Sequence, residues 1–503
     1  MKVAVIGAGP AGLACALELE RLGVRPVIYE RQHRVGAPTE TVALLLHLAY
    51  RPVPDQLAYL AEKCRLSVRP LAVLRAIHMH SCSRRTVVHG RKLGYLLARG
   101  RQPDSLERQL AAHLQLPVIF ETAADALTLA RHFDAVAVAT GDSTVARSLG
   151  CWQEYTNTII KGATVLGRFD PAAVHMYYDT RYSGHCYGFL APFDRERASL
   201  HLCVGGIGKS DMDDHWELFL ESEKLHYPVV ETFDMEFHCG RVTRHRQGNL
   251  FLIGNSGSFV SNLLGLGLFP GLISGVLAAR AIVYGLDYEA LVRPLARHID
   301  RMDDIRLALE RLDNRGLDRL VGLFGLPGIK QLVYNSRFDV IRHAHNFLKE
   351  LPGMKESFQY KYHSGGLPAG AAGTRRETGV PGAAAGATPD SAAIKDVFHT
   401  QSHRPPPAVT NNRPTATAAG APRPETLPPP AAAAGGRTGI RRPDRPLKLI
   451  GTGNTGNNRL RPPAMSPFKH PAGLIVDKKP LPLDAISGRL IPAPDNTPGG
   501  AAE

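Results

Sequence analysis

The chain has 503 residues, of which 44% are hydrophobic and 21% are charged, and its formal net charge is +14. This length allows two or three domains with a large core and excludes a small scaffold held together by disulfides. The seven cysteines form no Cys-x-x-Cys pair. Reduced thiols and a cytoplasmic location are therefore expected.

The last part of the chain differs in composition from the rest. Residues 363–503 hold 23 of the 38 prolines and carry 17 Lys and Arg against 9 Asp and Glu. A segment with so few clustered apolar residues cannot offset the entropy of ordering, so we predict a disordered basic tail. Its charges are dispersed among prolines, which favours a solvated linker or an arm that docks a protein partner and argues against specific nucleic-acid binding.

The chain begins with a strand, turn and helix pattern. An apolar run at residues 3–6 is followed by Gly7, Gly9 and Gly12 in a Gly-x-Gly-x-x-Gly arrangement, and a helix is predicted over residues 13–22. A second apolar run, residues 27–30, closes on Glu30. The whole unit is typical of a dinucleotide-binding fold. Because glycines interrupt the first apolar run, a signal peptide is not expected.

The spacing of this unit has a chemical reason. Gly7 permits the tight turn, Gly9 allows close approach of a pyrophosphate, and Gly12 allows the helix to pack against the strand. Pro10 and Ala11 lie at the start of that helix, whose positive N-terminal end faces the phosphates. The Glu30 carboxylate can accept hydrogen bonds from a ribose, which favours FAD or NAD. Arg31 beside it leaves a 2′-phosphorylated cofactor open.

Elements of both kinds follow in chain order. The apolar spacing predicts a helix over residues 41–50, broken by two prolines, and a second helix over residues 55–64 capped by Asp55. Residues 71–89 and 94–99 are expected to form strands, and residues 105–114 a helix. Residues 133–141 are predicted to be a buried strand that ends in a turn at Gly141.

The second half of the folded part is predicted to contain an inserted sheet. Residues 151–245 are rich in β-strand patterns and include one helix at 213–223, and residues 249–254 form another buried strand. Residues 259–286 are long and nearly uncharged, but their glycines favour a cofactor-binding helix over a membrane span. Amphipathic helices are expected over residues 288–351. The predicted class is α/β, with a Rossmann-like FAD-binding domain (1–150 and 246–285), an antiparallel β substrate domain (151–245), a helical region (286–362) and the tail (363–503).

Three segments together resemble a known family. Residues 7–30, the short strand 134–141 and the Gly-rich stretch 252–275 are similar to the three FAD-binding segments of oxidoreductases of the geranylgeranyl reductase type. That family lies within the larger group that includes p-hydroxybenzoate hydroxylase. The resemblance covers about residues 1–350. Residues 187–192 also look like the strand that lines the substrate cavity of these reductases, and residues 94–110 like the segment whose arginine reaches the FAD.

The resemblance implies a role for each matching residue. Gly7, Gly9 and Gly12 would hold the pyrophosphate and Glu30 the adenosine ribose. Arg99 would contact the phosphate or ribityl region, and Asn255, next to Gly254, would take the place of the usual ribityl-binding Asp. Gly265 and Gly267 would offer backbone N–H groups to the flavin. Tyr187 and Phe189 would face a substrate cavity, with packing in the core as the alternative. Cys186 beside them is expected to be a buried structural cysteine, with contact to flavin or substrate as the alternative, and no catalytic residue is assigned.

The chain also departs from the family pattern. Asn255 carries no charge, and residues 35–41 lack the cysteine that family reductases place near the flavin. Thr140 and Gly141 stand where the hydroxylase branch has Asp-Gly, which argues against an aromatic monooxygenase. The implied reaction is hydride or electron transfer to or from an apolar substrate, isoprenoid or quinone-like, with NAD(P)H or ferredoxin as transient donor. A lipid substrate would bring the protein to a membrane surface.

Two other functions stay open. One is an FAD monooxygenase or a flavoprotein similar to lycopene cyclase. The other is a non-catalytic flavin-binding scaffold whose tail recruits partners. Separately, His78, His80 and Cys82 share one face of a predicted strand, as zinc ligands do. A polar strand face is the favoured interpretation, and no metal is expected.

Overall fold

The computed structural model describes residues 1–36 and 39–351, which belong to one compact unit of the chain. The predicted basic tail, with its suggested role in partner binding, lies outside the described residues. The first sheet has six strands in the order β13-β14-β7-β1-β2-β6 and is parallel except for the pair β13–β14. Its strands are β1 (Val3–Ile6), β2 (Val27–Tyr29), β6 (Val118–Ile119), β7 (Ala135–Val138), β13 (Arg246–Gln247) and β14 (Leu250–Leu252).

This sheet forms because its central strands are apolar on both faces. Every residue of β1 and β7 is buried, as expected for parallel strands covered by helices. On one face, α1 (Pro10–Arg21) crosses α8 (Leu268–Tyr284) at very short distance. A Cβ added at Gly275 of α8 would lie 2.2 Å from the carbonyl oxygen of Ala11, so this crossing requires a glycine. The α/β class and the Rossmann-like parallel sheet predicted from the sequence are confirmed.

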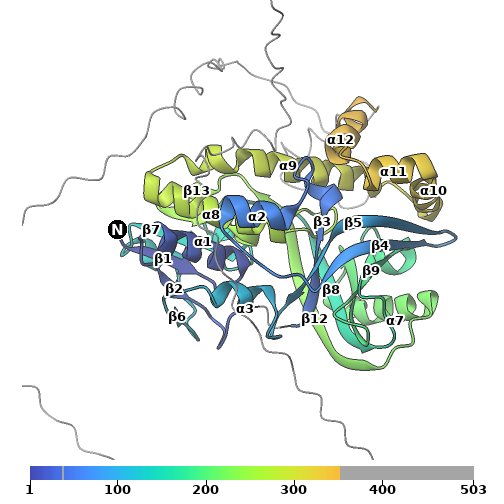
Figure 1. Ribbon diagram of the computed structural model, residues 1–503, viewed down its shortest axis with the longest axis horizontal. Coiled ribbons are helices and arrows are strands. Elements are labelled where there is room, and N and C mark those ends of the chain that lie inside the picture. The colour runs from blue at the N-terminus through green and yellow to red at the C-terminus, as the bar shows by residue number, and fades with distance from the viewer. Residues whose placement is uncertain (37–38, 352–503) are drawn as a thin grey trace, which may run out of the picture. The chain divides into compact units, whose positions relative to one another are not determined.

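The second sheet has eight strands in the order β12-β8-β11-β10-β9-β4-β5-β3. All neighbours are antiparallel except β4 and β9, which run parallel with Ala76 opposite Ala173. Figure 1 shows this sheet beside the first one, with α7 below it. Its strands are β3 (Thr41–Leu46), β4 (Ala72–Ser81), β5 (Arg85–Arg99), β8 (Trp152–Leu166), β9 (Ala173–Tyr178), β10 (Gly188–Pro192), β11 (Arg197–Gly205) and β12 (Val229–Val242).

Two expectations about residues 41–99 are wrong. Residues 41–50 were expected to be helical, but they form β3 followed by the short helix η1 (His47–Tyr50), because β3 pairs along its whole length with β5. The antiparallel sheet was also expected from residues 151–245 alone. In the structure, β3, β4 and β5 complete it, so a segment from the N-terminal part of the chain supplies three of its strands.

The remaining helices are short except for α9. Asp55 caps α2 through a hydrogen bond from the Ala58 N–H, as predicted. Figure 1 shows α9 running along both sheets toward α10–α12. The helices are α2 (Gln56–Cys64), α3 (Leu106–Ala111), α4 (Ala126–Ala130), α5 (Thr144–Ser148), α6 (Thr180–Ser183), α7 (Met212–Glu223), α9 (Tyr288–Leu309), α10 (Asn314–Gly325), α11 (Pro327–Tyr334) and α12 (Val340–Glu350), with short η2 (Lys209–Asp211) and η3 (Gly254–Gly257).

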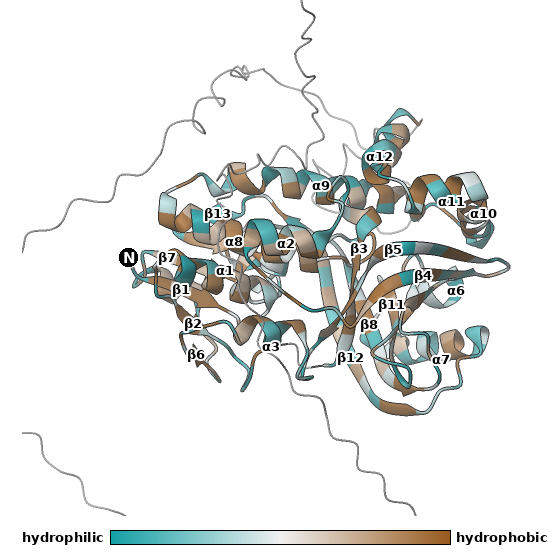
Figure 2. Ribbon diagram, in the orientation of Figure 1, coloured by the Kyte–Doolittle hydropathy of each residue, from teal (hydrophilic) through white to brown (hydrophobic). Residues whose placement is uncertain are grey.

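The Gly-rich stretch is only partly helical. Residues 259–267 form a loop, and the helix α8 begins at Leu268. Within the described part of the chain, no helix combines the length and the apolar character needed to span a bilayer. Figure 2 shows the hydrophobic residues concentrated where α8 and the sheets meet.

Candidate functional site

One continuous cavity of about 1360 Å³ connects the two sheets. At one end it is lined by the glycine turn after β1 and by the ends of β2 and β7. At the other end it is lined by apolar residues of the second sheet and of α9–α12. This volume exceeds that of the usual single-ligand pocket, so the cavity has room for a cofactor and a substrate together. Every predicted cofactor residue except Gly12 lines it, and so do Cys186, Tyr187 and Phe189.

The three glycines of the turn differ in what surrounds them. Gly7 has φ +100°, and an added Cβ there would lie 2.3 Å from the Ala139 carbonyl oxygen. A Cβ on Gly12 would lie 1.9 Å from the Gly7 oxygen, so Gly12 serves packing and does not face the cavity. An added Cβ on Gly9, in contrast, would meet no atom within 4 Å. The space beside Gly9 is therefore open toward the cavity.

The start of α1 is prepared for an anion. Gly9 is its N-cap, no side chain caps the helix, and Pro10 occupies the first helical position. The free N–H groups of the first turn and the helix dipole are left for a ligand. Open space and backbone N–H donors without a side-chain cap therefore coincide beside Gly9, and this arrangement fits the pyrophosphate of a dinucleotide.

Glu30 is held at the end of β2 beside this turn. It is 8% exposed, and its carboxylate accepts hydrogen bonds from the Ala8 N–H (2.7 Å) and the Gln32 N–H (2.9 Å). Each carboxylate oxygen has a second lone pair, so the group still has acceptor capacity toward the cavity. The next residue, Arg31, is largely exposed and lies 3.7 Å from the Asp142 carboxylate, just after Gly141.

The third segment forms the opposite wall. The Gly254 N–H donates to the Ser274 hydroxyl (2.9 Å), which ties the turn after β14 to α8. Gly265 and Gly267 lie in the loop before α8, and Gly267 is the N-cap of that helix without a side-chain cap. Asn255 borders this loop, with its Oδ1 3.2 Å from the position that a Cβ on Gly267 would take. A second uncapped helix N-terminus thus faces the cavity.

Two residues of α9 that the sequence did not single out organise this loop. Asp303 accepts hydrogen bonds from the backbone N–H (2.9 Å) and the side-chain amide (3.0 Å) of Asn262. Arg306, one turn further, donates to the Asn262 carbonyl (3.4 Å), to the Cys186 thiol (3.3 Å) and to Glu310 (2.7 Å). The only sequence signal for these residues is that charges stand next to the apolar stripe of an amphipathic helix.

Arg99 lies at the end of β5, where the cavity passes from one sheet to the other. Its guanidinium forms an ion pair with Glu107 of α3, whose side chain is fully buried. This partner fixes the arginine and leaves its other N–H groups available toward the cavity.

The predicted substrate residues lie together at the apolar end. The Tyr187 hydroxyl is close to Gly265, 3.4 Å from the position that a Cβ would take there. Burial raises the pKa of Tyr187 well above its usual value, so the phenol stays protonated and can donate a hydrogen bond. Phe189 packs edge-on against His201 with 4.4 Å between ring centroids. Cys186 touches Arg306, as described above.

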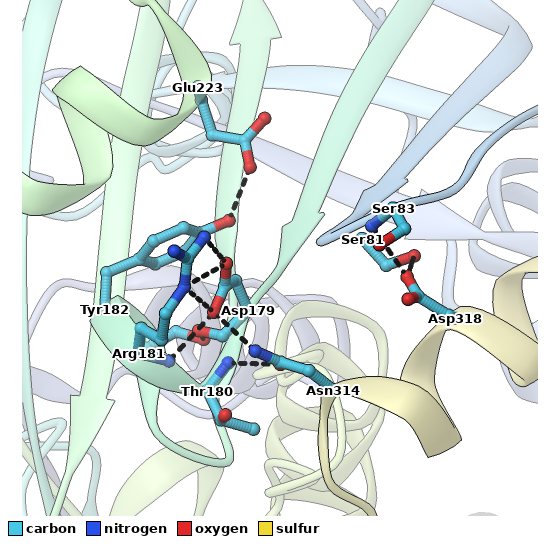
Figure 3. Close-up of polar contacts among 10 residues, drawn as sticks. Ser81, Ser83, Asp179, Thr180, Arg181, Tyr182, Glu223, Asn314 and Asp318 are labelled. Carbon is cyan, nitrogen blue, oxygen red and sulfur yellow. Dashed lines mark hydrogen bonds and ion pairs between the residues drawn. The ribbon is translucent and has the colours of Figure 1, made fainter.

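Helix α10 covers this end of the cavity and is held by polar contacts at two points (Figure 3). Asn314 donates to the Asp179 carboxylate (2.9 Å) and accepts from the Thr180 N–H (2.9 Å). One turn later, Asp318 accepts hydrogen bonds from the Ser81 hydroxyl (2.7 Å) and the Ser83 N–H (2.9 Å). These contacts fix α10 to the end of β4 with the turn after it, and to the start of α6, which follows β9.

The histidines of β4 pack against His175 of the neighbouring strand β9. His78 stacks on His175 with 4.4 Å between centroids, and His80 lies 3.2 Å from His175. Burial lowers the pKa of His80 to about 4, which keeps it neutral. Cys82 is exposed, and among residues 1–36 and 39–351 no cluster of three potential ligands suits a metal ion.

Comparison with known proteins identifies the N-terminal part of the chain. Residues 2–149 match the family model DAO, described as FAD dependent oxidoreductase. This part of the chain is therefore similar to FAD-dependent oxidoreductases. Over 35 residues it is also 60% identical to the glutamate synthase [NADPH] small chain of Escherichia coli (strain K12). That match covers 7% of this chain and only 7% of the length of the curated relative.

The likeness to solved structures extends beyond residues 2–149. A geranylgeranyl bacteriochlorophyll reductase-like protein from Thermoplasma acidophilum superposes with a TM-score of 0.55 at 14% identity, covering 72% of this chain and 98% of its own. A flavoprotein/dehydrogenase from Cytophaga hutchinsonii gives a TM-score of 0.49 at 12% identity, covering 71% and 100%. The first likeness establishes a shared fold.

Proposed function

We propose that this chain is an FAD-dependent oxidoreductase that transfers hydride or electrons to or from a small apolar substrate, isoprenoid or quinone-like. The observation that carries the proposal is the continuity of the cavity. Its polar end has the features of a dinucleotide site, and its other end is lined by apolar side chains. Bound FAD would supply the redox chemistry, which no amino-acid side chain provides.

The chain's own residues would bind and orient the cofactor. The N-terminus of α1 and the open space at Gly9 suit the pyrophosphate, and the Glu30 carboxylate suits the ribose. Arg99, fixed by Glu107, would contact the phosphate or ribityl region, and Asn255 would hydrogen-bond the ribityl chain. The loop of Gly265 and Gly267, anchored by Asp303, would place N–H groups where negative charge accumulates on reduction.

At the apolar end, two polar side chains would orient the substrate. Arg306 uses three of its five N–H groups within the protein, which leaves two for a ligand oxygen. The Tyr187 phenol is a second donor. Such a pair suits a largely hydrocarbon molecule with one oxygen-bearing group, and the surrounding apolar wall excludes water from the reacting atoms.

Half-reactions of the purified protein test this proposal. The full-length protein, loaded with FAD and photoreduced without oxygen, is mixed with a panel of quinones and isoprenoid alkenes, and flavin absorbance is followed. We expect reoxidation by at least one apolar acceptor and a slower rate per bound flavin with Arg306→Met. NAD(P)H and reduced ferredoxin are then compared as donors. A flavin that reacts only with oxygen, and then hydroxylates an aromatic compound, would assign the protein to the monooxygenases instead.

A further inference from the structure

The apolar end of the cavity opens to the surface between the C-terminal helices. Leu323 of α10 and Phe347 of α12 both line the cavity, yet their exposures are 44% and 66%. The nearby Leu326 and Leu351 do not line the cavity and are exposed, so the cavity wall and the outer surface meet in this region. Inside this opening the wall is formed by further apolar residues of the same helices, such as Leu320, Phe324 and Ile341.

The surface around the opening is apolar. Leu326 (53%), Leu332 (43%) and Leu351 (37%) are exposed on α10–α12 or at their ends. Together with Leu323 and Phe347 they form a set of large hydrophobic side chains within one 29-residue stretch, 323–351. Exposed apolar patches of this kind mark interaction sites. Figure 2 shows hydrophobic and hydrophilic residues interleaved along these helices.

The polar residues of the same helices are mainly basic. Five exposed cations accompany the apolar residues: Arg315, Arg319, Arg337, Arg342 and Lys349. Two of the acidic residues are already used inside the protein, since Asp318 binds Ser81 and Ser83 and Asp339 caps α12. The third acidic residue, Glu350, is exposed, and against five exposed cations it leaves the exposed charge of residues 314–351 net positive.

Exposed Leu and Phe side chains interspersed with Arg and Lys on short helices, as at Arg315, Arg319 and Leu323, are typical of segments that lie in a membrane interface. The cations fit anionic headgroups, and the long arginine and lysine side chains can extend to them while the apolar side chains insert. A protein partner would cover this surface and close the opening. A bilayer would leave the opening in contact with the hydrocarbon phase.

We infer that the surface formed by α10–α12 docks on an anionic lipid bilayer, so that an apolar substrate passes from the membrane directly into the cavity. The inference rests on the proposed function for the nature of the substrate. The docking itself depends only on the exposed side chains and on their continuity with the cavity. Entry from the membrane explains why apolar residues surround the opening, since such residues would not favour the binding of a water-soluble substrate.

Vesicle flotation with the full-length protein tests this inference. Vesicles of phosphatidylcholine alone are compared with vesicles that contain phosphatidylglycerol, at low and high salt. We expect binding to the anionic vesicles, weakened severalfold by high salt. The double variant Leu323→Ser/Phe347→Ser should lower binding at least tenfold. Leu127→Ser/Val230→Ser is the matched control, because those side chains are 44% and 59% exposed but lie on α4 and β12.

The outcomes separate docking from the proposed redox function. Unchanged FAD content in each variant shows that it is folded. The inference is overturned if the wild type does not bind anionic vesicles. It is also overturned if Leu323→Ser/Phe347→Ser binds as well as the control variant, because another segment would then be responsible for lipid binding. A protein that docks but binds no flavin would overturn the proposed function and leave the docking intact.

Discussion

Replacing Gly9 by alanine should separate cofactor binding from folding. Gly9 has φ −78°, which any residue adopts, and its added Cβ would meet no protein atom within 4 Å. Alanine removes backbone freedom from the unfolded chain, which stabilises by about 0.4–1 kcal/mol. It is also a poorer N-cap than glycine, at a cost of similar size. The free energy of unfolding of the apoprotein should therefore change by less than about 1 kcal/mol.

The effect on FAD should be much larger. The methyl group would occupy the open space beside the first turn of α1, where the pyrophosphate would lie. Each charge-assisted hydrogen bond lost from a backbone N–H costs about 1.5–3 kcal/mol. Loss of one such bond weakens binding by roughly ten- to a hundredfold.

The assay combines urea unfolding of the apoproteins with fluorescence titration of FAD. Gly322→Ala is the control, because Gly322 lies in α10 and an added Cβ there also meets nothing within 4 Å. That variant should bind FAD normally and gain up to about 1 kcal/mol of stability. The reasoning is refuted if Gly9→Ala binds FAD within about threefold of the wild type, or if it fails to fold.

Three further substitutions test other parts of the structure. Gly275→Ala forces a Cβ to within 2.2 Å of the Ala11 oxygen, so α1 and α8 must separate, and urea unfolding should show a loss of about 1–3 kcal/mol. Glu30→Gln leaves one of the two backbone N–H groups that donate to Glu30 unpaired. FAD titration should therefore show weaker binding, and urea unfolding should show that the folded state loses about 1–3 kcal/mol of stability. A variant with unaltered FAD binding and stability would show that the carboxylate is not needed. Burial lowers the pKa of His201 to about 3, so below about pH 6.5 the unfolded chain takes up a proton that the folded chain does not. Stability should therefore fall by about 1.4 kcal/mol per pH unit from this group as the pH drops from 6.5 toward 3, and should gain nothing from it above 6.5. Unfolding measured from pH 7.5 to 5 should show a shallower decline for His201→Gln; an identical slope would contradict the assignment.

The sequence was sufficient for the nucleotide end because its determinants are local. Strand, glycine turn, helix and Glu30 follow each other within thirty residues, and the structure places them as this order dictates. The segments at Gly141 and Gly254 also carry their signal in short motifs. The structure brings them to one cavity because all three follow parallel strands of the same sheet, whose carboxyl ends meet at one edge.

The parts that were mispredicted depend on long-range pairing. Residues 41–50 have apolar side chains at helical spacing, but the pairing of Leu46 with Gly94 and of Thr41 with Arg99 makes residues 41–46 a strand. The parallel pairing of β4 with β9 joins residues almost a hundred positions apart, and no local sequence pattern predicts this pairing. Tertiary contacts of this kind override local preference.

The residues of α9 were missed for a related reason. Asp303 and Arg306 belong to no motif, and charges on an amphipathic helix usually face solvent. Their role becomes visible only when Asn262 and Cys186, from two distant segments, are seen beside them.

The central claim is that the polar end of the cavity is an FAD site, and flavin content tests it most directly. The purified full-length protein, or the apoprotein incubated with FAD and passed through a desalting column, is denatured, and the released flavin is quantified by absorbance. The account predicts FAD equimolar with the chain and almost none with Gly9→Ala. A well-folded wild-type protein that retains no FAD and gives no saturable titration would contradict it.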